Sequence, residues 1–177
     1  AGADLKSIMR LKPSDAASIY SGIERVKKNF RIIETLGKPV VSLLNGTALG
    51  GGWEVALVGH HRIAIDDRKT QFGLPEVTLG LLPGASGITK MTRHLGLLGA
   101  QPYLLEGKLF GPREALSLGL VHELAADAGE LRAKALAWIT AHPTAQHAWD
   151  AKDYKIPGGK PTNPEVAMAL SVAPAML

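Results

Sequence analysis

The first clear pattern along the chain is an amphipathic stretch near its beginning. Apolar side chains recur there every three or four residues, at Ile19, Ile23, Val26, Phe30 and Ile33. This spacing places them on one face of an α-helix of about five turns. Ser14 or Asp15, just after Pro13, can cap the helix, and the Gly-Lys-Pro segment at 37–39 ends it.

Short strands and helices are predicted to alternate through most of the remaining chain. Residues 40–44 and 62–65 predict short buried strands, because a strand covered on both faces needs no polar alternation. Residues 72–82 predict short extended structure broken by Pro75 and Gly80. Helices are predicted at 51–58, from the glycine loop at 84–87 through His94, and at 97–106, 112–118, 129–141 and 165–172. This alternation favours a layered α/β domain.

The composition changes after His142. Residues 154–164 are rich in proline and glycine, which predicts a linker or a crossing arm. Trp138, Trp149 and Tyr154 are interpreted as packing residues for this arm. The chain is therefore divided into a core at 1–141 and an arm with a short helix at 142–177.

Composition narrows the classes of function. Of the 177 residues, 46% are apolar and 20% charged, and the net charge is +4. Lys and Arg residues are dispersed and aromatic residues make up only 5%, so the sequence does not predict nucleic-acid binding. No apolar run approaches the ~20 residues of a membrane span. The lack of cysteine excludes disulfides and thiolate nucleophiles, and fits a reducing compartment.

The histidines do not predict a metal site. All six are scattered along the sequence, and the adjacent His60 and His61 have neither the spacing of a helical ligand pair nor a third ligand nearby. We interpret this pair as a solvated strand end and expect no bound metal.

The glycine turn at 50–52 is the strongest candidate for chemistry. It follows a predicted strand and opens a predicted helix, whose N-terminus offers unpaired N–H groups and a partial positive charge. Glu54 lies three residues after Gly51 and so shares its helix face. The pair either stabilises a developing negative charge beside an acid or base, or holds a carboxylate that only complements the helix dipole.

Glu76, which follows Pro75, also has two readings. It is either an exposed glutamate in a turn or, because apolar residues flank it, a desolvated carboxyl group whose raised pKa suits proton transfer. Two glutamates can divide acid and base work when their environments separate their pKa values. Dinucleotide-binding, P-loop and serine-hydrolase motifs are missing, and Ala85-Ser86-Gly87 is interpreted as a helix cap.

Several segments, in order, resemble the enoyl-CoA hydratase/isomerase (crotonase) superfamily. They are Ala-Gly-Ala-Asp at 1–4, Asn-Gly-x-Ala-x-Gly-Gly-Gly-x-Glu at 45–54, Phe-Gly-x-Pro-Glu-x-x-x-Gly at 72–80 and Pro-Gly at 83–84. Gly-Lys at 107–108 and the segment at 115–121 look like its later helices and strand. The resemblance covers roughly residues 1–141, and the order and spacing of its motifs make it specific.

The resemblance implies a fold and a reaction. The fold would be a spiral of repeated ββα units, and the substrate an acyl-CoA thioester. The N–H groups of Ala3 and Gly51 would form an oxyanion hole, and Glu54 and Glu76 would be the catalytic glutamates. Having both glutamates favours reversible hydration of trans-2-enoyl-CoA to 3-hydroxyacyl-CoA, with enoyl-CoA isomerisation as a further activity.

The resemblance also implies binding partners and alternatives. Ala1 and Leu5 would contact CoA, which arrives as part of the substrate, and no other cofactor is implied. A homo-oligomer or a fatty-acid oxidation complex would be the assembly. The alternatives are another crotonase-type isomerase or acyl-CoA hydrolase, and a non-catalytic acyl-CoA-binding module.

The tail is similar to the region after the hydratase module of multifunctional fatty-acid oxidation alpha chains. There a 3-hydroxyacyl-CoA dehydrogenase domain follows segments like Trp-Asp-Ala-Lys at 149–152 and Tyr-Lys-Ile-Pro-Gly-Gly at 154–159. The comparison predicts an N-terminus truncated before the first motif. It implies the bacterial cytoplasm, with the mitochondrial matrix as the alternative.

Two departures from the family pattern stand out. Trp53 stands where a smaller residue such as cysteine is frequent, and is expected to narrow or reshape the neighbouring pocket. Pro-Gly-Ala-Ser-Gly at 83–87 departs slightly from the usual Pro-Gly-x-Gly-Gly, with little predictable effect.

Overall fold

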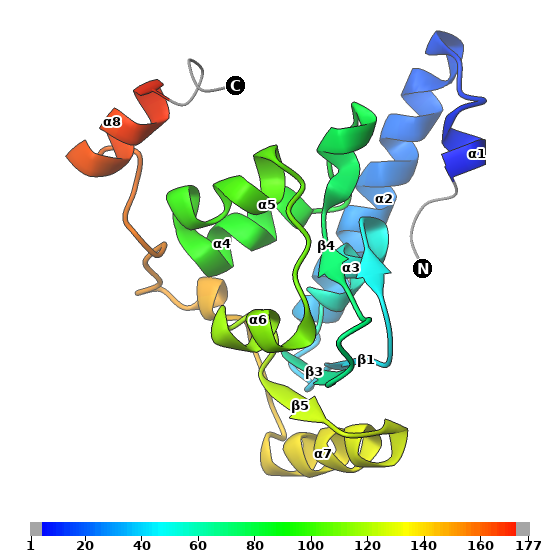
Figure 1. Ribbon diagram of the computed structural model, residues 1–177, viewed down its shortest axis with the longest axis vertical. Helices are drawn as coiled ribbons and strands as arrows, with labels where there is room; N and C mark the ends of the chain where they lie inside the picture. Colours follow the sequence, from blue (N-terminus) through cyan, green and yellow to red (C-terminus); the bar gives the residue numbers. More distant parts are fainter. Residues whose placement is uncertain (1–4, 173–177) are drawn as a thin grey trace.

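The structure, a computed structural model, describes residues 5–172, and short strands alternate with helices along it (Figure 1). The helices are α1 (Leu5–Ile8), α2 (Ala16–Glu34), α3 (Gly51–Ala56), α4 (Gly87–Gly99), α5 (Gln101–Leu105), α6 (Pro112–Ser117), α7 (Ala128–Ala141) and α8 (Pro164–Val172). The strands are β1 (Val41–Leu44), β2 (Ala48–Leu49), β3 (His61–Ile65), β4 (Phe72–Gly73) and β5 (Glu123–Ala125). Single 3₁₀ turns cover Pro13–Asp15, Pro75–Leu79 and Ala148–Asp150.

The strands form a repeated ββα pattern. β1 pairs in parallel with β3, and β2 pairs in parallel with β4, so that β1-β2-α3 and β3-β4-α4 are successive units of one spiral. β5 continues the first sheet by pairing with β3. The parallel pairing follows from the helices that connect the strands, because such connections carry the chain back to the same sheet end. The predicted α/β spiral is confirmed.

The main apolar core lies between these units and includes the Trp53 side chain. The Trp53 ring is fully buried, stacks on Phe72 with 5.1 Å between centroids and meets Phe110 edge-on at 5.3 Å. Its indole N–H points to the sulfur of Met91 at 3.4 Å. The Trp53 side chain therefore fills the core between the units, and the expectation that it narrows or reshapes a neighbouring pocket stays a prediction.

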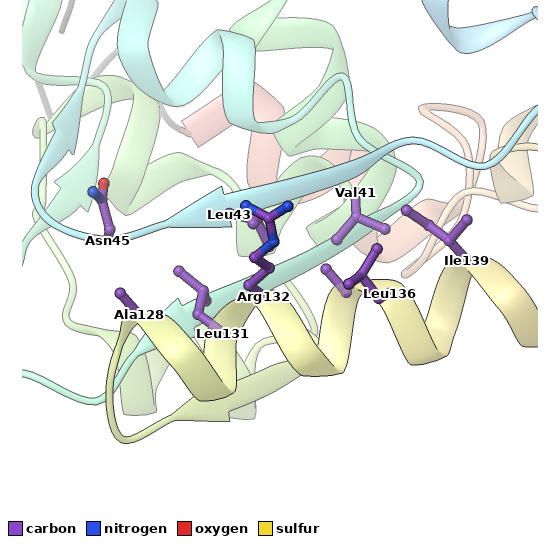
Figure 2. A pocket seen from close by; sticks show the side chains of 9 residues that line it. Val41, Leu43, Asn45, Ala128, Leu131, Arg132, Leu136 and Ile139 are labelled. Carbon is purple, nitrogen blue, oxygen red and sulfur yellow. The ribbon is translucent and has the colours of Figure 1, made fainter.

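A second apolar cluster joins the β1–β3–β5 sheet to α7, through Ile63, Ala125, Leu131 and Ala135. An open groove of about 500 Å³ runs between β1 and α7, lined by residues such as Val41, Leu43 and Leu136 (Figure 2). In the described part of the chain, β1 has a partner strand on one side only. None of the described helices is long and apolar enough to cross a membrane.

Several elements of the structure differ in extent or type from the predicted ones. The predicted extended structure at 72–82 is wrong for its middle part, because Pro75–Leu79 forms a 3₁₀ helix that ends at Gly80 with φ +68°. The helix that opens at Gly87 continues past His94 to Gly99, with a kink at Gly96 (φ +79°). Trp149 and Tyr154 hold the arm against α4, as expected: Trp149 meets the His94 ring edge-on, and the Tyr154 hydroxyl donates to the Arg93 carbonyl at 2.6 Å.

Candidate active site

The glycine turn presents the first N–H groups of α3 at the site. Gly50 has φ +55°, a conformation that L side chains rarely adopt, and its N–H donates to the Gly73 carbonyl at 2.9 Å. Gly51 is the first residue of α3, so its N–H has no acceptor within the helix. Pairing of β2 with β4 therefore fixes an available N–H donor beside the turn.

Glu54 lies on the first turn of α3 and is held by the N-terminus of α4. Its side chain is only 3% exposed. One carboxylate oxygen, Oε1, accepts the N–H groups of Ala85 at 2.8 Å and Gly87 at 2.7 Å. A Cβ on Gly87 would lie 3.0 Å from this oxygen, so glycine allows the close approach. The two bonds orient Glu54 and leave Oε2 for another group.

Glu76 lies on the 3₁₀ helix after β4 and is half-buried. Its Oε1 borders the glycine turn, because a Cβ on Gly50 would stand 2.9 Å from it. Its Oε2 is buried and has no hydrogen-bond partner among the described residues. An unpaired buried carboxyl oxygen is costly unless the group is protonated or meets a ligand. Glu76 is therefore not an ordinary turn glutamate.

Glu54 and Glu76 differ in the neighbouring groups that act on their pKa values in addition to burial. Burial raises the pKa of Glu54, but the N–H groups of Gly87 and Ala85 and the charge of Lys90 act against this rise. Burial also raises the pKa of Glu76, its own backbone N–H opposes the rise, and the negative charge of Glu54 adds to it. Both pKa values are thus raised, and the groups around Glu54 favour its ionised form more than those around Glu76 do, a difference that suits a division into base and acid.

A buried ion pair behind Glu54 was not anticipated from the sequence. Lys90 of α4 pairs with Glu34 at the end of α2, and both side chains are about 4% exposed. Desolvation lowers the pKa of Lys90, and the carboxylates of Glu34 and Glu54 raise it. The sequence shows that Lys90 lies three residues after Gly87 and so on the same face of α4. It does not show that Glu34 is the partner of Lys90, because Glu34 is distant in sequence.

The sequence candidates divide into three groups. Gly51, Glu54 and Glu76 come together around the glycine turn. Ala1 and Ala3 lie outside the described residues. Leu5 begins α1, and its side chain is likewise not described. The amides of Ala85 and Gly87 were missed as partners of Glu54, although the glycine loop before α4 already predicted a helix N-terminus there.

Ser86 occupies the N-cap position of α4, as expected, but its side chain makes no capping hydrogen bond. The interpretation of His60 and His61 as a solvated strand end is wrong, because His61 is only 9% exposed and His60 is half-buried. Within the described residues, no group of three or more His, Cys, Asp or Glu side chains is arranged to hold a metal ion.

Comparison with known proteins shows the family to which the chain belongs. The family model described as "Enoyl-CoA hydratase/isomerase" matches residues 1–150. The chain is 42% identical over 124 residues to the "Fatty acid oxidation complex subunit alpha" of Shewanella frigidimarina, over 70% of this chain and 17% of the relative. It is 40% identical to the "Probable enoyl-CoA hydratase" of Bacillus subtilis, over 77% of this chain and 52% of that protein.

Solved structures give the same result. An enoyl-CoA hydratase from Bacillus anthracis matches with a TM-score of 0.69 and 30% identity, over 80% of this chain and 52% of the other. An enoyl-CoA hydratase from Thermoplasma volcanium matches with a TM-score of 0.67 and 33% identity, over 81% of this chain and 54% of the other. The chain therefore spans about half the length of these hydratases and a smaller share of the alpha subunit.

Proposed function

Because the chain belongs to the enoyl-CoA hydratase/isomerase family, we propose that it carries the hydratase site of a fatty-acid β-oxidation enzyme. The reaction is reversible addition of water to trans-2-enoyl-CoA, which gives 3-hydroxyacyl-CoA. The observation that carries the proposal is that an anchored Glu54 and a Glu76 whose Oε2 has no hydrogen-bond partner among the described residues both lie at the glycine turn that opens α3.

Each group has one role in this reaction. The N–H groups of Gly51 and Ala3 hold the thioester oxygen as negative charge develops on it, and loss of one such donor typically lowers the rate ~10²–10³-fold. Glu54 positions a water molecule through its free oxygen and takes a proton from it. The resulting hydroxide adds to Cβ, and Glu76 delivers a proton to Cα. Ala1 and Leu5 contact CoA, which is the only cofactor-like group required.

The first test follows hydration of crotonyl-CoA by loss of the conjugated enoyl absorbance. The 177-residue chain is compared with Glu54→Gln and Glu76→Gln, which keep the size of each side chain. Each substitution should lower turnover by about 10²–10⁴-fold, the usual contribution of a general acid or base. Glu106→Gln, an exposed glutamate after α5, is the matched control and should retain the parent rate. Turnover near the parent rate in either site variant contradicts the proposal.

Isomerisation of 3-enoyl-CoA is the second candidate activity, because Glu76 alone can move a proton between two carbons while Gly51 holds the enolate. A 3-enoyl-CoA substrate separates the two reactions. Glu54→Gln should lower the hydration rate and spare isomerisation, whereas Glu76→Gln should lower the rates of both reactions. Hydrolysis of a saturated acyl-CoA, or binding without turnover, would instead favour the alternative functions.

The assembly and location are part of the same proposal. Residues 1–141 form the hydratase core, and 142–177 form an arm that leads toward a dehydrogenase domain. The named curated relatives come from bacteria and include a subunit of a fatty acid oxidation complex. Their names favour a bacterial cytoplasmic enzyme that acts within such a complex or as a homo-oligomer, over a mitochondrial one.

A further inference from the structure

A second polar site lies at the other end of α3 from Glu54. After α3 the chain turns at Gly59 into β3, and the arm returns to this end of the molecule. A cavity of about 380 Å³ lies between the arm and the body. Its wall includes Arg62, Arg93, His94, His122, His147 and Trp149, and none of the described residues that line it is acidic.

Arg62 brings a buried charge to this cavity. Its side chain is 1% exposed, and its guanidinium donates to two backbone carbonyls, of Leu120 and of Gly59. Burial lowers the pKa of Arg62 to about 10, a value at which the group keeps its charge near neutral pH. Within residues 5–172 no carboxylate forms an ion pair with it. Buried charges are normally paired, so this arrangement leaves a positive charge to be balanced.

The hydrogen bonds of His122 leave one of its ring nitrogens as a donor that faces another donor. Its Nδ1 accepts the backbone N–H of Arg62 at 2.9 Å, so in the neutral ring the proton must be on Nε2. This Nε2–H lies 3.5 Å from Nη2 of Arg62, which is also a donor. Two donors therefore face each other, and an oxygen that accepted from both would satisfy them.

Trp149 and Arg93 add further hydrogen-bond donors near Arg62, and His94 supplies one acceptor. His94 Nε2 lies 3.3 Å from Arg62 Nη2 and can accept from it, which places the His94 proton on Nδ1. Burial, then the Arg62 charge, lowers the pKa of His94 to about 2, so this ring is neutral. Trp149 Nε1 is buried without an acceptor among the described residues. The Arg93 guanidinium lies 5.4 Å from the Trp149 ring centre and makes no ion pair in the described part of the chain.

We propose that this cavity binds a phosphate-type oxyanion between the arm and the body. The anion oxygens accept from Arg62 Nη2 and His122 Nε2, and the Arg93 charge holds the anion from the α4 side. Because the arm contributes His147 and Trp149 to the wall, bound anion also fastens the arm to the core. The site is independent of the proposed hydratase reaction, which uses the opposite end of α3.

The test measures binding of inorganic phosphate to the 177-residue chain by calorimetry at pH 7 and low ionic strength. The parent should bind saturably, and added salt should weaken binding because the contact is electrostatic. Arg93→Gln should weaken the affinity at least five-fold. Arg25→Gln, which removes the same charge from an exposed position on α2, should leave it unchanged. Absence of saturable binding, or equal weakening in both variants, overturns the proposal.

A second variant tests the donor at His122. His122→Asn keeps an acceptor for the Arg62 N–H but removes the Nε2 donor, so it should fold and bind phosphate several-fold more weakly. The source of the phosphate group is distinguished by free CoA. Arg93-dependent binding of CoA that is tighter than binding of inorganic phosphate assigns the group to CoA, and affinity for inorganic phosphate equal to that for CoA assigns a site for the free anion. Parent-like phosphate affinity in His122→Asn contradicts the placement of the anion.

Discussion

At the scale of single residues, Ser86 has a strained backbone conformation between the two residues whose N–H groups hold Glu54. It has φ +107°, a positive value found at no other non-glycine position in the described chain, and its buried hydroxyl has no partner there. The flanking Ala85 and Gly87 N–H groups hold Glu54. Ser86→Gly should raise the free energy of unfolding by about 1 kcal/mol, because glycine adopts this φ without strain. Urea denaturation measures the change.

The matched control is the same substitution in an ordinary helix. Ser21 is exposed inside α2, and Ser21→Gly should lower stability by roughly 0.5–1 kcal/mol through the flexibility of glycine. If Ser86→Gly were no more stable than the parent, Ser86 would not be strained. The sequence showed that Ser86 departs from the family pattern, but only the backbone angle gives the departure a physical consequence.

At the scale of elements, two glycines without steric neighbours should respond in opposite directions to alanine. A Cβ on Gly22 in the middle of α2, or on Gly80 after the 3₁₀ helix, would meet no atom within 4 Å. Gly22→Ala should stabilise the chain by about 1 kcal/mol, because alanine is the better helix former. Gly80→Ala should destabilise it by about 1–2 kcal/mol, because its φ of +68° suits glycine. Thermal unfolding of the two variants measures the change in stability for each. Changes in the same direction would contradict the prediction.

Elements with a strong period or a clear boundary could be predicted. The apolar spacing of α2 and the proline at the first position of α6 were sufficient, because each signal is local. The two-residue strand β2 was not separable from a loop, since its pairing with β4 is set by contacts between distant segments. The 3₁₀ helix after β4 was missed for a related reason: its proline and glycine fit a broken strand as well as a tight helix.

At the scale of the whole molecule, the sequence indicated the site better than its surroundings. Gly51, Glu54 and Glu76 could be found because each stands in a short motif whose spacing has a chemical meaning. The contacts that tune them come from other elements, such as the Lys90–Glu34 pair that joins α4 to α2. The histidines looked scattered for the same reason. Folding brings His60 and His147 to 4.7 Å between ring centres, although 87 positions separate them in sequence.

The packing of the arm should make the stability of the whole chain sensitive to acid. His147 is 4% exposed, and burial lowers its pKa from 6.5 to about 4. Below pH 6.5 the unfolded chain therefore binds a proton that the folded chain excludes. The contribution of neutral His147 to the free energy of unfolding is fully present above pH 6.5. It is lost as the pH falls toward 4, and the loss amounts to about 3 kcal/mol. Denaturation in phosphate-free buffers at several pH values measures the loss.

His147→Gln isolates this contribution from that of the other buried histidines. The glutamine amide can still donate to the Val58 carbonyl, as His147 Nε2 does at 3.0 Å, but it does not titrate. The variant should be close to the parent in stability at pH 8 and should lose less stability between pH 6.5 and 4. Parallel pH profiles would mean that His147 is protonated in the folded chain, and the arm would then not exclude water from its ring.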